Sequence, residues 1–356
     1  MTSPLVRWLQ GSLVVLGVLA CAPAPAAPAT PAPATAPAAR APEAPLTVRV
    51  GTTGALAEAG QYLALDRGYF AEEGLQIEYV PFDAAARMIP ALGADQLDVG
   101  GGGVSAGLFN AIARGVGIRI VGPQARHEPG QSSVYLTVRR DLVDGGLVRD
   151  YADLRGRVLA IAARASVNEY AAHLVAERGG FAPADLQLVE LGFGEMVTAL
   201  ANGAIDAAIQ AEPTVTVAVE RGVATRWREI ADLNPRFQFT VVLYSPTFAS
   251  ERAEAARRWM VAYLRGVRDY TDAFRRGKDR SQVVEVLTRW TPIKDPAVYD
   301  RMGFTAIDPN GEVDRPSLES QLRWLAAQGL LQGEVTLEQV LDPRFAQYAI
   351  ERLGRY

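Results

Sequence analysis

The chain has 356 residues, of which 49% are hydrophobic, and a formal net charge of −4. This length and apolar content allow two ordinary domains, each with its own core. The slightly acidic balance excludes the broad basic surface of a nucleic-acid-binding protein. Two histidines and one cysteine are too few for a usual zinc or iron site, so no metal and no cofactor are expected.

The N-terminus has the pattern of a lipoprotein signal. Arg7 precedes an apolar run over residues 13–20 that is too short to cross a bilayer. The run ends at Ala20 and Cys21, which resembles a bacterial lipobox and implies a diacylated Cys21 as the first mature residue. Cys21 has no second cysteine to pair with, and two acyl chains give stable anchoring. An incidental thiol inside a cleaved signal is the alternative.

The segment after the signal is a predicted tether. We expect residues 1–20 to be the signal peptide and residues 21–45 to be the acylated cysteine and an Ala/Pro-rich spacer. Such a composition cannot bury a core, and its prolines favour an extended polyproline II conformation.

The first predicted structural unit alternates strands and helices. Pro90 lies inside its second helix, where we expect a kink because proline removes a backbone donor. Short strands that alternate with helices of about ten residues are typical of a parallel sheet with helices on its faces. In chain order the predicted elements are strand 46–51, helix 59–67, strand 75–80, helix 84–92 and strand 97–100.

The same order of elements then recurs. The run Arg67, Gly68, Tyr69, Phe70 returns as Arg178, Gly179, Gly180, Phe181. The residues after it recur in the same order once one three-residue deletion is allowed. Solenoids need three or more copies of a much shorter repeat, so two copies of this length indicate two similar α/β lobes. The predicted elements of the second copy are strand 157–162, helix 167–177, strand 186–191, helix 195–201 and strand 205–209.

The remaining segments complete the two lobes. Residues 133–138 and 239–244 are expected to be strands at the edges of the second copy, at two crossovers between the lobes. Apolar residues at a spacing of three to four predict helices over 251–275, 281–290 and 317–328, which would belong to the first lobe.

The repeat also predicts where a ligand would bind. In open α/β sheets ligands lie beyond the carboxyl ends of the strands, so two facing lobes share a cleft. The loops expected there are 51–54, 82–83 and 100–105 in the first lobe, and 163–166, 192–194 and 210–214 in the second.

Helix starts supply the first candidate ligand contacts. Gly102 and Gly103 would let backbone amides approach a ligand, and a helix is expected to start near Ser105, just after Val104. Arg164 precedes a helix for which Ser166 is the expected N-cap, with Ala165 between them. A guanidinium beside helix amides suits an anionic group. A plain turn and a solvated arginine are the alternatives.

The other candidates offer hydroxyls, rings and one carboxylate. Thr52 and Thr53 could bind a ligand beside Gly54, or simply fill the strand end. Glu212 could meet a ligand amine or ring N–H, pair with Arg164 in an empty site, or lie at the rim. Two phenylalanines at equivalent repeat positions could enclose an aromatic ligand or belong to the core. They are Phe82 and Phe193.

Two enzyme-like motifs are present. The weaker is a GxGxxA match at Gly101, Gly103 and Ala106, which follows the third strand of its unit, whereas a dinucleotide-binding fingerprint follows the first. Residues 103–107 match the GxSxG pattern of hydrolases, with Ser105 as the nucleophile. That mechanism needs a downstream histidine, and the chain offers only His127, close to the serine, and His173. A serine hydrolase is therefore the weaker alternative to a binding protein, and we expect no enzyme.

Several segments together resemble a known family. The series Tyr62–Phe70 (YLALDRGYF), 91–99 (ALGADQLDV), 154–158 (LRGRV) and 321–330 (QLRWLAAQGL) is similar to the taurine, nitrate, alkanesulfonate and thiamine-precursor group of ABC-transporter solute-binding proteins. The resemblance covers roughly residues 46–350.

The resemblance carries specific expectations. It implies a two-lobed periplasmic-binding-protein fold of type II, with lobe 1 over 46–137 plus 245–356 and lobe 2 over 138–244. It further implies a monomer outside the cytoplasm that closes its lobes on a small anionic or heteroaromatic solute and delivers it to an ABC permease. A sensor lipoprotein that presents its ligand to a signalling receptor is the alternative.

Overall fold

A computed structural model describes residues 44–82 and 85–356, and Ala44–Tyr356 form one unit. The predicted signal peptide, Cys21, most of the tether and Asp83 lie outside the described residues. Within the described part of the chain, no helix is both long and apolar enough to cross a bilayer.

The first lobe is built on a mixed five-stranded sheet with the order β2-β1-β3-β10-β4. Parallel pairing joins β1 to β2 and to β3, whereas β10 runs antiparallel between β3 and β4. The strands are β1 (Leu46–Thr52), β2 (Leu75–Pro81), β3 (Val99–Gly103), β4 (Arg119–His127) and β10 (Phe237–Tyr244).

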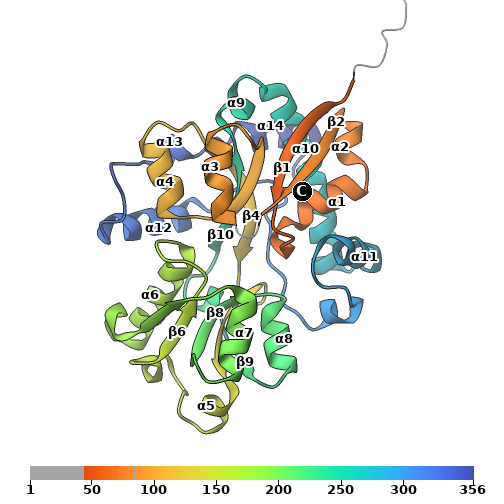
Figure 1. Ribbon diagram of the computed structural model, residues 1–356. Helices are drawn as coiled ribbons and strands as arrows, with labels where there is room; N and C mark the ends of the chain where they lie inside the picture. The colour runs from red at the N-terminus through yellow and green to blue at the C-terminus, as the bar shows by residue number, and fades with distance from the viewer. Residues whose placement is uncertain (1–43, 83–84) are drawn as a thin grey trace, which may run out of the picture. The chain divides into compact units, whose positions relative to one another are not determined.

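Helices cover both faces of this sheet (Figure 1). One core cluster joins α1 and α10 to the sheet, and another joins α3, α4 and α12 to it. The helices are α1 (Ala59–Asp66), α2 (Tyr69–Glu72), α3 (Met88–Gly93), α4 (Ala106–Ala113), α9 (Pro246–Ser250), α10 (Ala253–Arg276), α11 (Arg280–Trp290), α12 (Arg315–Ala327), α13 (Leu337–Val340) and α14 (Arg344–Leu353).

Helix α10 packs closely against α1 because both helices lack a side chain at the crossing. A Cβ atom on Gly266 would lie 2.0 Å from the carbonyl oxygen of Gly60. Trp259, Tyr263 and Tyr270 are buried along α10 at a spacing of about one or two turns. The helical pattern predicted for this segment is confirmed, and its apolar face forms much of the first core.

The second lobe repeats the plan with a sheet of order β7-β6-β8-β5-β9. Here β6 is parallel to β7 and β8, and β5 is antiparallel to β8 and β9. The elements are β5 (Val134–Arg139), α5 (Arg140–Asp144), β6 (Val158–Ile161), α6 (Val167–Gly179), β7 (Gln187–Glu190), α7 (Phe193–Ala201), β8 (Ala207–Ala211), α8 (Thr214–Glu220) and β9 (Ala224–Glu229).

In the described part of the chain two crossovers join the lobes, and they differ from the expected boundaries by most or all of one strand. The whole of β5 pairs within the second sheet and the whole of β10 within the first. The chain therefore changes lobe over residues 128–133 and 230–236, instead of at 137/138 and 244/245. Both strands were expected from the sequence, but only their pairing partners decide to which lobe they belong.

The helix interrupted by proline also differs from the prediction. A short 3-10 segment, Ala85–Arg87, precedes α3, which begins at Met88. Pro90 thus lies in the first turn of α3, where its missing amide hydrogen costs no intrahelical bond. A later helix start replaces the expected kink.

Candidate ligand-binding site

Parallel strands place the predicted loops at one edge of each sheet. In the first lobe β1, β2 and β3 end at Thr52, Pro81 and Gly103, and in the second lobe β6, β7 and β8 run parallel in the same way. The side chains that follow these strand ends are the candidates for ligand contact.

Two of the predicted loops bond directly to each other across the lobes. Ser105 and Ser166 form an isolated antiparallel bridge. The amide of Ala106 donates to the carbonyl of Ala165 at 2.9 Å, and the amide of Val167 donates to that of Val104 at 3.0 Å. The sequence analysis predicted that both loops lie at the cleft, but it did not predict that backbone hydrogen bonds between them join the two lobes.

Each of these loops leads into a helix through a serine cap. Ser105 accepts a hydrogen bond from the Leu108 amide at 3.4 Å, and Ser166 accepts one from the Asn168 amide at 3.2 Å. The expected N-cap at Ser166 is confirmed.

The glycines before Ser105 allow close backbone approach. Gly102 has a φ of 150°, and a Cβ there would lie 2.5 Å from the Cβ of Ala85. A Cβ on Gly103 would lie 3.0 Å from a methyl carbon of Val167, in the other lobe. Both glycines therefore stand where chain segments meet, and Gly103 lies on the contact between the lobes.

Carboxylates of the chain already surround Arg164. Its guanidinium donates to Glu169 at 3.0 Å and to the Leu188 carbonyl at 2.7 Å, and Glu190 lies 3.9 Å away. Glu169 also accepts from the Ala165 amide at 2.6 Å. An anionic ligand at the start of α6 would therefore have to displace Glu169. The assignment of Arg164 to a ligand anion stays a prediction.

In the first lobe, the loop after β1 is organised around Glu58. The hydroxyls of Thr52 and Thr53 donate to its carboxylate at 2.6 and 2.8 Å, and the Thr53 amide donates at 3.0 Å. Gly54 follows with a φ of 73°, and its amide donates to the Thr52 hydroxyl at 3.2 Å. Both threonines thus do more than fill the strand end. Glu58, at the end of the 3-10 segment Leu56–Glu58, is a residue that the sequence analysis missed.

The two phenylalanines pack in different places. Phe82 is partly buried against the cluster that includes α3 and α4, and its amide donates to the Thr52 carbonyl at 2.8 Å. Phe193 begins α7 and is partly buried against the core of the second lobe. Both rings contact a core. A sandwich of an aromatic ligand between them stays a prediction.

Glu212 pairs with a residue that the sequence analysis did not consider. Its carboxylate accepts from Arg226 at 2.7 Å, from the Gly303 amide at 3.1 Å and from the Thr216 amide at 3.0 Å, and its side chain is fully buried. The expected alternative of an ion pair with Arg164 is not what the structure shows. Because Gly303 follows α11 in sequence, Glu212 ties the second lobe to a segment from the C-terminal part of the chain.

Helices α6 and α12 form a further contact between the lobes. The Trp324 indole donates to Nδ1 of His173 at 3.0 Å, and the Tyr170 hydroxyl lies 3.2 Å from that of Ser320. Burial lowers the pKa of His173. A groove of 820 Å³ runs beside this contact and includes Arg164.

The hydrolase motif has no histidine partner in the residues described here. Nδ1 of His127 accepts from the Ser133 amide at 3.4 Å, and His173 is bound to Trp324. The Ser105 hydroxyl is used as the cap of α4. In the same residues, no three His, Cys, Asp or Glu side chains gather as metal ligands.

The NMT1/THI5-like family model matches residues 57–273, which is more than half of the chain. The chain belongs to this family. The match confirms the resemblance to the solute-binding group and leaves the lipoprotein assignment a prediction. Comparison with curated proteins gives no match.

Solved structures show the same fold at low sequence identity. The ligand-binding component of an ABC-type import system from Staphylococcus aureus, with zinc bound, has a TM-score of 0.68 at 12% identity over 85% of this chain and 99% of that one. The periplasmic aliphatic sulphonate-binding protein SsuA from Escherichia coli has a TM-score of 0.66 at 21% identity, over 84% and 93%.

An enzyme has this fold as well. The desulfurization enzyme DszB has a TM-score of 0.60 at 18% identity, over 86% of this chain and 99% of the enzyme. The two-lobed fold of periplasmic binding proteins is therefore established for this chain, and it is compatible with both binding and catalysis.

Proposed function

We propose that this protein is the extracytoplasmic solute-binding component of an ABC importer. One observation carries the proposal. In a chain of this family, the loops that follow the parallel strands of two α/β lobes contact each other at Ser105 and Ser166. The similarity to an ABC-type import component and to a sulphonate-binding protein supports it. The solute is a small organic molecule held between the lobes, and no covalent step is needed.

Ligand capture then works by lobe closure. Within the described residues, the chain crosses between the lobes at 128–133 and 230–236, and these two segments are the proposed hinge. A ligand drives closure when it makes contacts that need both lobes, because only such contacts favour the closed state. An ABC permease receives the solute from the closed protein.

A binding screen tests the proposal. The purified protein is heated with ethanesulfonate, taurine, 4-aminopyrimidine or 4-methylpyrimidine, and each stabilising compound is titrated by calorimetry. A solute that binds only the folded protein raises the free energy of unfolding by about 2.7 kcal/mol at 100 times its dissociation constant. If no compound of the panel stabilises the protein, the proposal of solute import is contradicted.

We propose further that the protein is held at the membrane by a lipid on Cys21. The support is the run of apolar residues that ends in Ala20 and Cys21, together with the Ala/Pro-rich spacer that follows. Cys21→Ser should move the protein from the membrane fraction to the soluble or unprocessed fraction. Intact mass of the membrane-bound wild type gives the control, and an unmodified cysteine with normal membrane retention would contradict the anchor.

A second candidate function is catalysis, which the similarity to DszB favours. The chain has one cysteine, Cys21, outside the described residues, and Ser105 caps α4. We therefore expect no sulfur release from biphenyl-2-sulfinic acid, the compound bound in a solved structure of a DszB mutant, and no hydrolysis of a model ester. Turnover of either compound that is lost in Ser105→Ala would favour an enzyme.

A further inference from the structure

The carboxylate of Glu58 is buried among hydrogen-bond donors. The side chain is 4% exposed and accepts from five groups. None of the ion pairs in the described residues includes it. The donors are the Thr52 hydroxyl at 2.6 Å, the Thr53 amide at 3.0 Å, the Thr53 hydroxyl at 2.8 Å, the Gln61 amide group at 3.4 Å and the Tyr62 hydroxyl.

This arrangement fixes the direction of each hydrogen bond to Glu58. An ionised carboxylate only accepts, so Thr52 and Thr53 each donate their single hydroxyl proton to Glu58. Burial, followed by the charge and the hydrogen bond of Glu58, raises the pKa of Tyr62 far above its ordinary value, so Tyr62 also remains a donor. None of these protons is left for a ligand.

The hydroxyl oxygen of Thr53 can consequently act toward a ligand only as an acceptor. Thr52 additionally accepts from the Gly54 amide at 3.2 Å, whereas the described residues place no donor on the Thr53 hydroxyl oxygen. Thr53 is half-buried at the carboxyl end of β1, where ligand contact is expected. A ligand group that binds this oxygen has to bring its own N–H or O–H.

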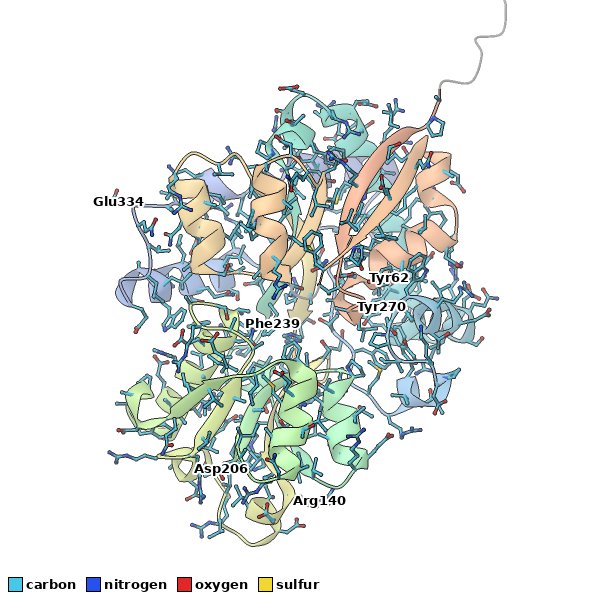
Figure 2. All side chains as sticks on the ribbon, viewed as in Figure 1. Tyr62, Arg140, Asp206, Phe239, Tyr270 and Glu334 are labelled. Carbon is cyan, nitrogen blue, oxygen red and sulfur yellow. The ribbon has the colours of Figure 1, made fainter. Side chains whose placement is uncertain are left out.

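Electron-rich rings stand beside the same carboxylate. Tyr62 lies on α1 (Figure 2), and its ring stacks on Trp290 with centroids 5.5 Å apart. Tyr79 contacts both rings edge-on, at 5.9 and 5.2 Å. The buried Tyr79 hydroxyl has no hydrogen-bond partner in the described residues, an orphan polar group beside the loop. Ring faces and a buried carboxylate both favour positive charge and disfavour negative charge.

We infer that Glu58 is a specificity-determining positioning residue, which polarises Thr53 so that the first lobe selects solutes bearing an ammonium or N–H group over plain anions. This inference rests on the proposed function and narrows its solute class. It predicts different affinities for taurine and ethanesulfonate, two sulfonates that differ by one ammonium group. It likewise predicts different affinities for 4-aminopyrimidine and 4-methylpyrimidine.

The test compares dissociation constants within each pair of compounds. Wild type should bind the amino compound about 10-fold more tightly than its partner, because only the amino compound can donate a hydrogen bond to Thr53, and in taurine that donor is charged. Glu58→Gln should reduce this preference about 10-fold or more. Its amide can donate to the Thr53 oxygen and release the threonine proton toward the ligand. Glu78→Gln, an exposed acid on β2, is the matched control and should keep the preference.

A second pair of variants covers the case in which Glu58→Gln fails to fold. Thr53→Val removes the acceptor and should lose the preference, whereas Thr53→Ser keeps the hydroxyl and should retain it. Equal binding of taurine and ethanesulfonate to wild type, or an unchanged ratio in Thr53→Val, would overturn the inference while solute binding itself stands. If wild type binds none of the compounds, the proposed function fails and the inference with it.

Discussion

His127 should make the stability of this protein fall on mild acidification. The side chain is fully buried on β4, and its ring centroid lies 5.1 Å from that of Phe239. Because Nδ1 accepts from the Ser133 amide, the proton of the neutral ring is on Nε2, which has no partner in the described residues. Burial lowers the pKa of His127 to about 3.

The sign and size of the effect follow from the two pKa values. In the unfolded chain a histidine titrates near 6.5, so between pH 6.5 and pH 3 the unfolded state binds a proton that the folded state does not. The stabilisation is complete above pH 6.5 and is lost as the pH falls toward the folded value. From pH 7 to pH 5 the free energy of unfolding should drop by about 2 kcal/mol on account of His127.

Urea denaturation at pH 7 and pH 5 measures this drop, and His127→Asn is the control. The asparagine Oδ1 can take the place of Nδ1 and keep the bond to Ser133, but it does not titrate. Carboxylates and His173 contribute equally to both proteins, so the difference between the two pH slopes isolates His127. Equal slopes for wild type and His127→Asn would refute the reasoning.

Three further predictions concern stability and use urea denaturation at pH 7. Arg226→Ala should cost about 3 kcal/mol, because it leaves the buried Glu212 carboxylate without its cation; a loss below 1 kcal/mol would contradict the pair. Arg164→Ala should cost less than about 1 kcal/mol, since Arg164 is exposed and its ion pairs are screened by solvent. Trp324→Phe should cost about 1 kcal/mol by removing the donor to His173, and it should cost nothing in a His173→Phe background.

Most of the fold could be predicted because its information is local. Alternating apolar residues over 46–51 and 75–80 became β1 and β2, and the helical pattern of 167–177 became α6. Strand pairing is not local. Nothing within residues 134–139 tells whether β5 joins the first sheet or the second, and this is why the predicted lobe boundaries missed the crossovers by most or all of one strand.

The site was predictable in position but less so in chemistry. The rule that ligands lie beyond parallel strand ends pointed to the loops at Thr52, Ser105 and Ser166, and the last two loops do meet. The partner of a charged side chain depends on contacts far along the sequence. Glu212 pairs with Arg226 and with the amide of Gly303, which no spacing near Glu212 could indicate.

Glu58 shows why side-chain identity alone misjudges the polarity of a binding loop. Two threonines suggest two donors and two acceptors, and Arg164 in the second lobe suggests an anion site. In the folded chain the Glu58 carboxylate accepts a hydrogen bond from each threonine hydroxyl, and Glu169 pairs with the guanidinium of Arg164. The charge that a cleft offers to a ligand is thus what remains after the chain has satisfied its own groups, and here acceptors remain in the first lobe.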